Sequence, residues 1–176
     1  MNLPNKLTMG RMIAVPFFIA AYMMGYHIAA LVIFCAASAT DALDGRIARK
    51  RGLVTNFGKI MDPLADKILV YSALCLFIES ELIEAWMLII ILAREFIVAG
   101  MRTVAASEGR VLAAGMSGKI KTVLQMAAVI IFLLGLCVPD IPAVMLAAKI
   151  LFWAALIMTV YSGAEYVYKN RDVFSM

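Results

Sequence analysis

Six long apolar runs alternate with short polar breaks along the chain. The runs cover roughly residues 8–25, 28–49, 57–79, 83–106, 118–137 and 143–167. Each is close in length to the ~20 residues that a helix needs to cross the hydrocarbon core of a bilayer. The breaks contain turn-favouring or charged residues, such as Gly25, Gly52, the acidic run ESELIE and Pro139. The pattern therefore predicts an all-α integral membrane protein, a single domain over residues 1–176 with six transmembrane helices.

The ends of these runs differ in charge. The segment MNLPNKL before the first run alternates polar and apolar residues, which predicts a short segment lying on the membrane surface. The loops at one set of ends carry Glu79, Glu81, Glu84 and Asp140. The opposite ends carry Lys6, Arg11, Lys50, Arg51, Arg110, Lys119, Lys169 and Arg171. Basic residues favour the cytoplasmic side, and an even number of spans returns both termini to one side, so we expect both termini to be cytoplasmic.

Composition supports a membrane protein and excludes some kinds of site. Hydrophobic residues make up 64% of the chain and charged residues 16%. A soluble domain has about 45–50% apolar and about 25% charged residues. The cysteines Cys35, Cys75 and Cys137 fall in three different apolar runs without metal-type spacing, which argues against a disulfide framework or a zinc site.

Four aspartates lie between Ala39 and Lys67, where two predicted spans approach the cytoplasmic side. Asp41 and Asp44 are three residues apart near the end of the second run, and Asp62 and Asp66 are four apart near the start of the third. At these spacings each pair shares one face of a helix. A short loop joins the two helices, so we expect them to be antiparallel neighbours with the two carboxylate pairs facing one gap.

Converging carboxylates in a site of low dielectric repel one another unless they are protonated or neutralised by a cation. Hard ions such as Mg²⁺ and Mn²⁺ prefer oxygen ligands and keep coordination positions open for substrate phosphates. Gly45, Ala48 and Gly58 lie on the same faces and leave room for a ligand. The pattern predicts a site for one or two divalent ions and a phosphate at the membrane surface. In the alternative interpretation, the aspartates pair only with Arg46, Arg49, Lys59 or Lys67.

The spacing Asp41-x2-Asp44-Gly45-x2-Ala48-Arg49-x8-Gly58-x3-Asp62-x3-Asp66 matches the signature of the CDP-alcohol phosphatidyltransferases. The chain also resembles that family over essentially its whole length. The resemblance implies transfer of a phosphatidyl group from CDP-diacylglycerol to an alcohol with release of CMP. It also implies a homodimer in a bacterial inner membrane.

Residue roles follow from the same resemblance. Asp41, Asp44 and Asp62 correspond to metal ligands, and Asp66 to the proton acceptor, which also contributes to the metal site. The residues expected to bind CDP-diacylglycerol are Gly45, Ala48, Arg49, Thr55 and Gly58, together with Asn5 and Thr8 from the segment PNKLT.

A second polar cluster lies in the fourth and fifth runs. Arg94 and Arg102 share a helical face, Glu95 is adjacent, and Lys119 and Lys121 begin the fifth run. Charged residues inside spans are functional candidates, and Arg and Lys both suit phosphate binding. We expect the four cations to bind an anionic acceptor; alternatively, Arg102 and the lysines extend to the lipid headgroups.

The acceptor is suggested by three further segments. PNKLTMGRM, AREFIVAGMR and GKIKTVLQM look like the branch of the family that makes phosphatidylglycerophosphate, which implies glycerol 3-phosphate as the acceptor. The alternatives are another member of the family, such as a CDP-diacylglycerol-dependent cardiolipin synthase, or a divalent cation transporter, since intramembrane aspartates also mark ion paths.

Overall fold

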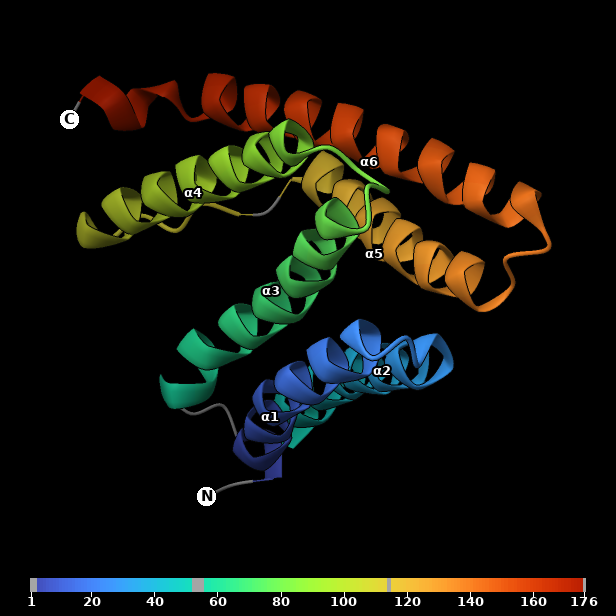
Figure 1. Cartoon of the computed structure of the whole chain (residues 1–176). Coiled ribbons are helices and arrows are strands. Elements are labelled where there is room, and N and C mark those ends of the chain that lie inside the picture. Colours follow the sequence, from blue (N-terminus) through green and yellow to red (C-terminus); the bar gives the residue numbers. More distant parts are fainter. Residues whose placement is uncertain (1–2, 52–55, 114, 176) are drawn as a thin grey trace.

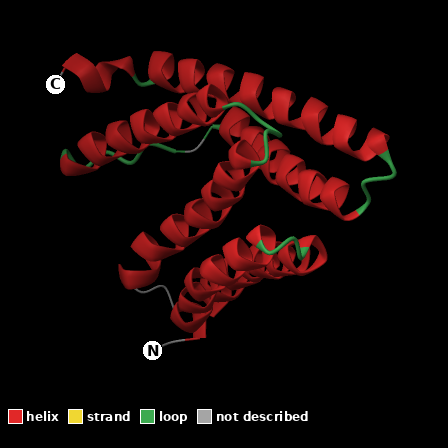
Figure 2. Ribbon diagram, viewed as in Figure 1, coloured by secondary structure: helices red, strands yellow, loops and turns green. Residues whose placement is uncertain are grey.

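The structure, a computed structural model, describes residues 3–51, 56–113 and 115–175, with side chains described except at 3–7, 41–51, 56–63, 66 and 174–175. The described chain is helical and contains no strand (Figure 2). Its elements are α1 (Leu3–Met23), α2 (His27–Arg51), α3 (Asn56–Glu79), α4 (Ala85–Ser107), α5 (Met116–Cys137), α6 (Pro142–Lys169) and the 3₁₀-helix η1 (Arg171–Ser175).

These bounds confirm the six predicted helices, most of whose ends lie within about two residues of the apolar runs. The main difference is α1, which begins at Leu3 and so includes most of the predicted surface segment. Within the described ranges, α5 and α6 are long and apolar enough to cross a membrane, and shorter apolar helical stretches cover Thr8–Met23 and His27–Thr40. The all-helical architecture is compatible with a membrane protein, while the expectation of six spans stays a prediction.

Local sequence explains where several helices start and stop. Gly25 (φ +77°) and Gly109 (φ +76°) follow α1 and α4 in the left-handed region, which is the usual glycine-dependent way to end a helix. Pro142 stands in the first turn of α6, where its missing N–H has no helical partner to lose. These residues therefore mark where α1 and α4 end and where α6 begins.

The helices pack as two groups, with α3 running from one toward the other (Figure 1). In the described chain, α5 packs along α6, and α1 packs against both α2 and α3. Helix α4 lies on α6, and α2 contacts α5. The predicted neighbours α2 and α3 do touch, although α3 makes more of its contact with α1.

A row of buried aromatic rings ties five of these helices together. Phe18 of α1 packs against Phe34 of α2 at 5.7 Å between ring centroids, and Tyr22 of α1 packs against Phe77 of α3 at 6.0 Å. Phe77 of α3 packs against Phe132 of α5 at 5.1 Å, and Phe132 packs against Phe152 of α6 at 6.0 Å. In lipid, helix association depends on such close packing because the hydrophobic effect contributes little. The row therefore holds the half of the bundle that lies away from the cationic helix ends.

Candidate active site

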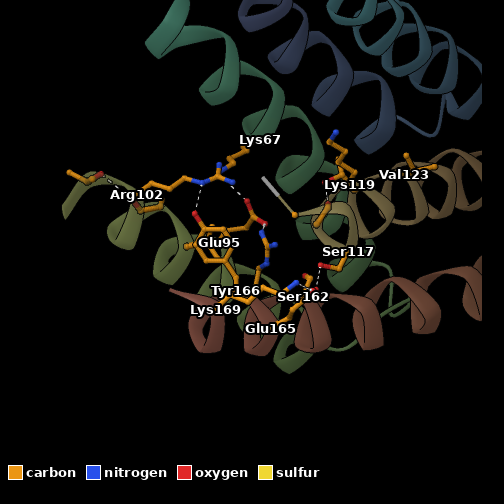
Figure 3. A pocket seen from close by; sticks show the side chains of 17 residues that line it. Lys67, Glu95, Arg102, Ser117, Lys119, Val123, Ser162, Glu165, Tyr166 and Lys169 are labelled. Carbon is orange, nitrogen blue, oxygen red and sulfur yellow. Dashed lines mark hydrogen bonds and ion pairs between the residues drawn. The ribbon is translucent and has the colours of Figure 1, made fainter. Parts of the chain in front are cut away.

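A cavity of about 810 Å³ opens between α3, α4, α5 and α6. It is formed by the first half of α3, the second half of α4, the start of α5 and the end of α6, so the helix ends predicted to share one side do meet here. Figure 3 shows side chains from these four helices converging on it. Its charged lining residues among those described are Lys67, Arg94, Glu95, Arg102, Lys119, Glu165 and Lys169. Cations outnumber carboxylates in this lining, which makes the cavity suited to an anion.

Glu95 is the point where three cations meet, two from the cavity lining and one from behind it. Arg94 Nη1 and Lys121 Nζ each donate a hydrogen bond to Glu95 Oε1 at 2.8 Å. Lys67 Nζ lies 3.0 Å from Glu95 Oε2. The Lys121 side chain is only 5% exposed and that of Lys67 is 41% exposed. One carboxylate from α4 thus connects α3, α4 and α5 and fixes how the cations face the cavity.

Contacts to Tyr166 and Glu165 organise the wall formed by α6. Arg102 Nε donates a hydrogen bond to the Tyr166 hydroxyl at 3.1 Å, and the guanidinium lies 5.4 Å from the centre of the Tyr166 ring. Ser117 Oγ and Lys169 Nζ both donate hydrogen bonds to Glu165. Arg102 and Lys169 are therefore held toward the cavity by neighbours on α6.

The predicted acceptor residues come together. Arg94, Arg102 and Lys119 line the cavity. Lys121 lines a smaller cavity of about 180 Å³, of which Lys67 and Glu95 also form part of the wall. The four cations therefore occupy one region, with Lys121 behind the main cavity and bound to Glu95.

For the four aspartates, the structure gives the helix to which each belongs. Asp41 and Asp44 belong to α2, and Asp62 and Asp66 belong to α3, so the spacings of three and four do occur on helices. Their side chains lie outside the described residues. Lys67, which follows Asp66, lines the cavity and pairs with Glu95. The part of α3 that carries Asp66 therefore borders the cationic cavity.

The remaining predicted residues fall mostly outside the described side chains. Asn5, Gly45, Ala48, Arg49 and Gly58 lie in α1, α2 and α3 with undescribed side chains, and Thr55 is outside the described chain. Thr8 is buried in α1 at 1% exposure. The described side chains contain no group of three or more His, Cys, Asp or Glu that could hold a metal ion. The aspartate pairs carry the oxygen ligands that Mg²⁺ and Mn²⁺ take, so their chemistry fits a divalent ion.

Comparison with known proteins identifies the family of this chain. Residues 1–161 match the family described as CDP-alcohol phosphatidyltransferase. The chain belongs to this family. A relative from Bacillus subtilis (strain 168), named CDP-diacylglycerol–glycerol-3-phosphate 3-phosphatidyltransferase, is 42% identical over 97% of this chain and 96% of its own length. A relative of the same name from Rickettsia felis is 36% identical over 98% of this chain and 97% of its own length.

A third relative carries a related name. The probable phosphatidylglycerophosphate synthase of Mycobacterium tuberculosis (strain ATCC 25618 / H37Rv) is 39% identical over 98% of this chain and 83% of its own length. The family is generally dependent on divalent metal ions, in agreement with the donor chemistry of the aspartate pairs. The membership of this chain in the family confirms the resemblance indicated by the aspartate signature.

Sequence reasoning did not identify several residues of the cavity. In the sequence, Lys67 is a candidate partner for an aspartate, and no pattern distinguishes Tyr166, Ser117 or Glu165. Glu95 is recognisable as an intramembrane charge, but two of its partners, Lys67 and Lys121, come from other helices, and no local spacing shows them. For Lys67 a signal did exist, because it directly follows Asp66 in the signature.

Proposed function

We propose that this protein transfers the phosphatidyl group from CDP-diacylglycerol to the 1-hydroxyl of sn-glycerol 3-phosphate, producing phosphatidylglycerophosphate and CMP. The observation that carries the proposal is the cation-rich cavity, which borders the part of α3 that carries Asp66. The printed names of the relatives from B. subtilis and R. felis support the same donor and acceptor.

The aspartates supply the reaction centre. Asp41, Asp44, Asp62 and Asp66 would hold one or two Mg²⁺ or Mn²⁺ ions, which when bound polarise phosphoryl oxygens and offset the charge of the leaving group. Asp66 accepts the proton of the acceptor hydroxyl as its oxygen attacks the β-phosphorus. The new P–O bond forms as the bond to CMP breaks, and CMP leaves with that electron pair.

The nucleotide end of the donor would be bound on the same side. Gly45, Ala48, Arg49, Thr55 and Gly58 would contact the cytidine diphosphate portion. From α1, Asn5 and Thr8 would complete that surface. Both acyl chains would stay in the bilayer while the diphosphate reaches the aspartates.

The cationic cavity binds the acceptor in this proposal. A phosphomonoester needs several charge-assisted hydrogen bonds, which Arg94, Arg102, Lys119 and Lys121 can provide together. Acceptor and aspartates then lie next to each other, and positioning supplies much of the rate because phosphoryl transfer asks little covalent chemistry of a protein. A neutral acceptor such as inositol would offer these cations no phosphate to bind.

The deciding experiment measures CMP release by purified protein supplied with CDP-diacylglycerol, sn-glycerol 3-phosphate and Mg²⁺. Asp66→Asn should abolish turnover while CDP-diacylglycerol still binds, because the amide cannot accept the proton as a carboxylate does. Asp140→Asn is the matched control, since Asp140 is exposed in the turn between α5 and α6. Normal turnover by Asp66→Asn would show that another group is the base.

Competing functions are separated by substrate. With glycerol 3-phosphate, phosphatidylglycerol, inositol and serine offered together, glycerol 3-phosphate should be consumed first. Preferential use of phosphatidylglycerol would instead indicate a cardiolipin synthase. Uptake of divalent ions into sealed vesicles without CMP release would indicate a transporter.

The setting of the enzyme is also proposed. We place it in the inner membrane of a bacterium as a homodimer, with six spans and with both termini and the active site in the cytoplasm. The basic residues at one set of helix ends support this orientation. Labelling of single cysteines introduced near Lys169 and near Asp140 in intact cells tests it, because only the second should react from outside.

A further inference from the structure

The side chain of Arg94 runs between α5 and α6 at two glycines. A Cβ atom placed on Gly163 of α6 would lie 2.9 Å from Arg94 Cγ and 3.8 Å from Arg94 Cβ. A Cβ atom placed on Gly118 of α5 would lie 3.1 Å from Arg94 Nη2. The stem of the arginine thus passes over one glycine, and its tip lies against the other.

The two glycines differ in how much they constrain Arg94. At Gly118 the close atom is the end of the side chain, which can shift by a few tenths of an ångström. At Gly163 the close atom is Cγ, and the distance is shorter than carbon atoms tolerate without movement. Because every atom beyond Cγ moves with it, a methyl group at residue 163 displaces the whole guanidinium.

Arg94 also connects two separate spaces. With Gly163 it lines an apolar groove of about 600 Å³ between α4 and α6, and it also lines the cationic cavity. Its side chain therefore passes from the side of the groove to the cavity, and the missing side chain at Gly163 leaves the space for this path.

Hydrogen bonding alone does not account for this path. Arg94 Nη1 donates to Glu95, but Arg94 Nε is buried and has no hydrogen-bond partner among the described residues. An unmatched buried donor is unfavourable, so the side chain would adopt another path if Nε decided its conformation. Contact with Gly163 and the bond to Glu95 fix the direction instead.

We propose that Gly163 is a positioning residue that sets acceptor specificity by directing Arg94 into the cationic cavity. The inference rests on the proposed function, in which the cavity binds a phosphate-bearing acceptor. Gly163 does not touch that acceptor; it acts through Arg94. The consequence is selective: a larger residue at this position impairs acceptor use and leaves CDP-diacylglycerol binding unchanged.

The test is a double-mutant cycle with Gly163→Ala and Arg94→Ala. For each of the four proteins, the KM for sn-glycerol 3-phosphate, the KM for CDP-diacylglycerol and the midpoint of thermal unfolding are measured. Gly163→Ala alone should raise the acceptor KM by about tenfold to a hundredfold, the range expected when a positioned group moves by about 1 Å. In the Arg94→Ala background the same substitution should leave the acceptor KM unchanged and should not lower the midpoint, because Cγ is gone.

Two further variants complete the test of the contact between Arg94 and Gly163. Gly100→Ala, at a glycine of α4 with open space around its Cβ position, is the matched control and should change neither KM. Gly118→Ala touches only the tip of Arg94 and should raise the acceptor KM less than Gly163→Ala does. It also carries the test if Gly163→Ala fails to fold.

The outcomes separate the inference from the proposed function. If the unsubstituted protein does not use glycerol 3-phosphate, the proposed function fails, while the unfolding midpoints of the cycle still report on the contact. If Gly163→Ala lowers the midpoint equally in both backgrounds, Arg94 is not what the methyl group meets, and the inference is overturned. A non-additive midpoint with an unchanged acceptor KM also overturns it, because the contact would then be structural only.

Discussion

Replacing Glu95 by alanine should destabilise the protein far more than replacing any one of its partners that faces water. The carboxylate pairs with Lys121, whose side chain is 5% exposed, and with Arg94, whose side chain is 14% exposed. Removing it leaves these charges packed together in a site of low dielectric. Loss of one member of a buried ion pair costs about 3–5 kcal/mol, mainly because the remaining charge is unpaired.

The same comparison of exposure predicts that Lys67→Ala changes the free energy of unfolding only slightly. Its side chain is 41% exposed, so water screens its attraction to Glu95, and an exposed pair contributes at most about 1 kcal/mol. For a chain of this size, 1 kcal/mol shifts the midpoint of thermal unfolding by about 2–4 °C. Glu95→Ala should therefore lower the midpoint by about 6–20 °C, and Lys67→Ala by about 4 °C or less.

The assay is thermal unfolding of the purified variants in one detergent, at one pH and salt concentration. Glu95→Gln should fall between the two, because the amide keeps one acceptor for Lys121 and loses the charge. Equal midpoints for Glu95→Ala and Lys67→Ala would refute the argument, since they would mean that Lys121 finds another partner or reaches water.

The remaining predictions concern the metal, the cavity wall and the C-terminal segment. Chelation by EDTA should stop CMP release, and added Mg²⁺ or Mn²⁺ should restore it; activity unchanged in EDTA would contradict a divalent-ion mechanism. Tyr166→Phe removes the hydroxyl that accepts from Arg102 Nε and keeps the ring beneath the guanidinium, so the acceptor KM should rise about twofold to tenfold, from a bond of about 0.5–1.5 kcal/mol. Arg110 donates a hydrogen bond to Asp172, which lowers the pKa of that exposed carboxyl. This contribution to the docking of η1 is present above the pKa of an unfolded aspartate, about 3.9, and is lost as the pH falls through the lower folded value. Hydrogen exchange of residues 171–175 should therefore speed up at acid pH after correction for the intrinsic rate, and Asp172→Asn should lose this pH dependence.

Much of the fold could be predicted because each helix is marked locally. Apolar length, Gly25, Gly109 and Pro142 act within a few residues of where they stand, and the helix bounds agree with them. Helix α4 shows the limit of this reasoning. It is as long as its neighbours, but Arg94 and Glu95 interrupt its apolar sequence, and only the tertiary structure shows that they face a cavity.

The site was predictable where its residues form a short-range pattern. Arg94 and Arg102 repeat at a helical spacing, which placed them on one face, and both line the cavity. The role of Glu95 was not accessible, because Lys121 and Lys67 reach it from α5 and α3. Gly163 has no local signal either, since its importance comes from one contact with Arg94 of another helix.

The aromatic row and the cationic cavity occupy opposite halves of the same helices. The aromatic row lies in the halves of α3, α5 and α6 that are distant from the aspartates, and it includes Phe77, Phe132 and Phe152. The charged lining comes from the halves near the aspartates. Substitutions in one half therefore leave the other largely intact. We therefore expect that the alcohol accepted by such a scaffold can be changed at cavity residues outside the Glu95 cluster, such as Arg102 and Lys119, without repacking the aromatic half.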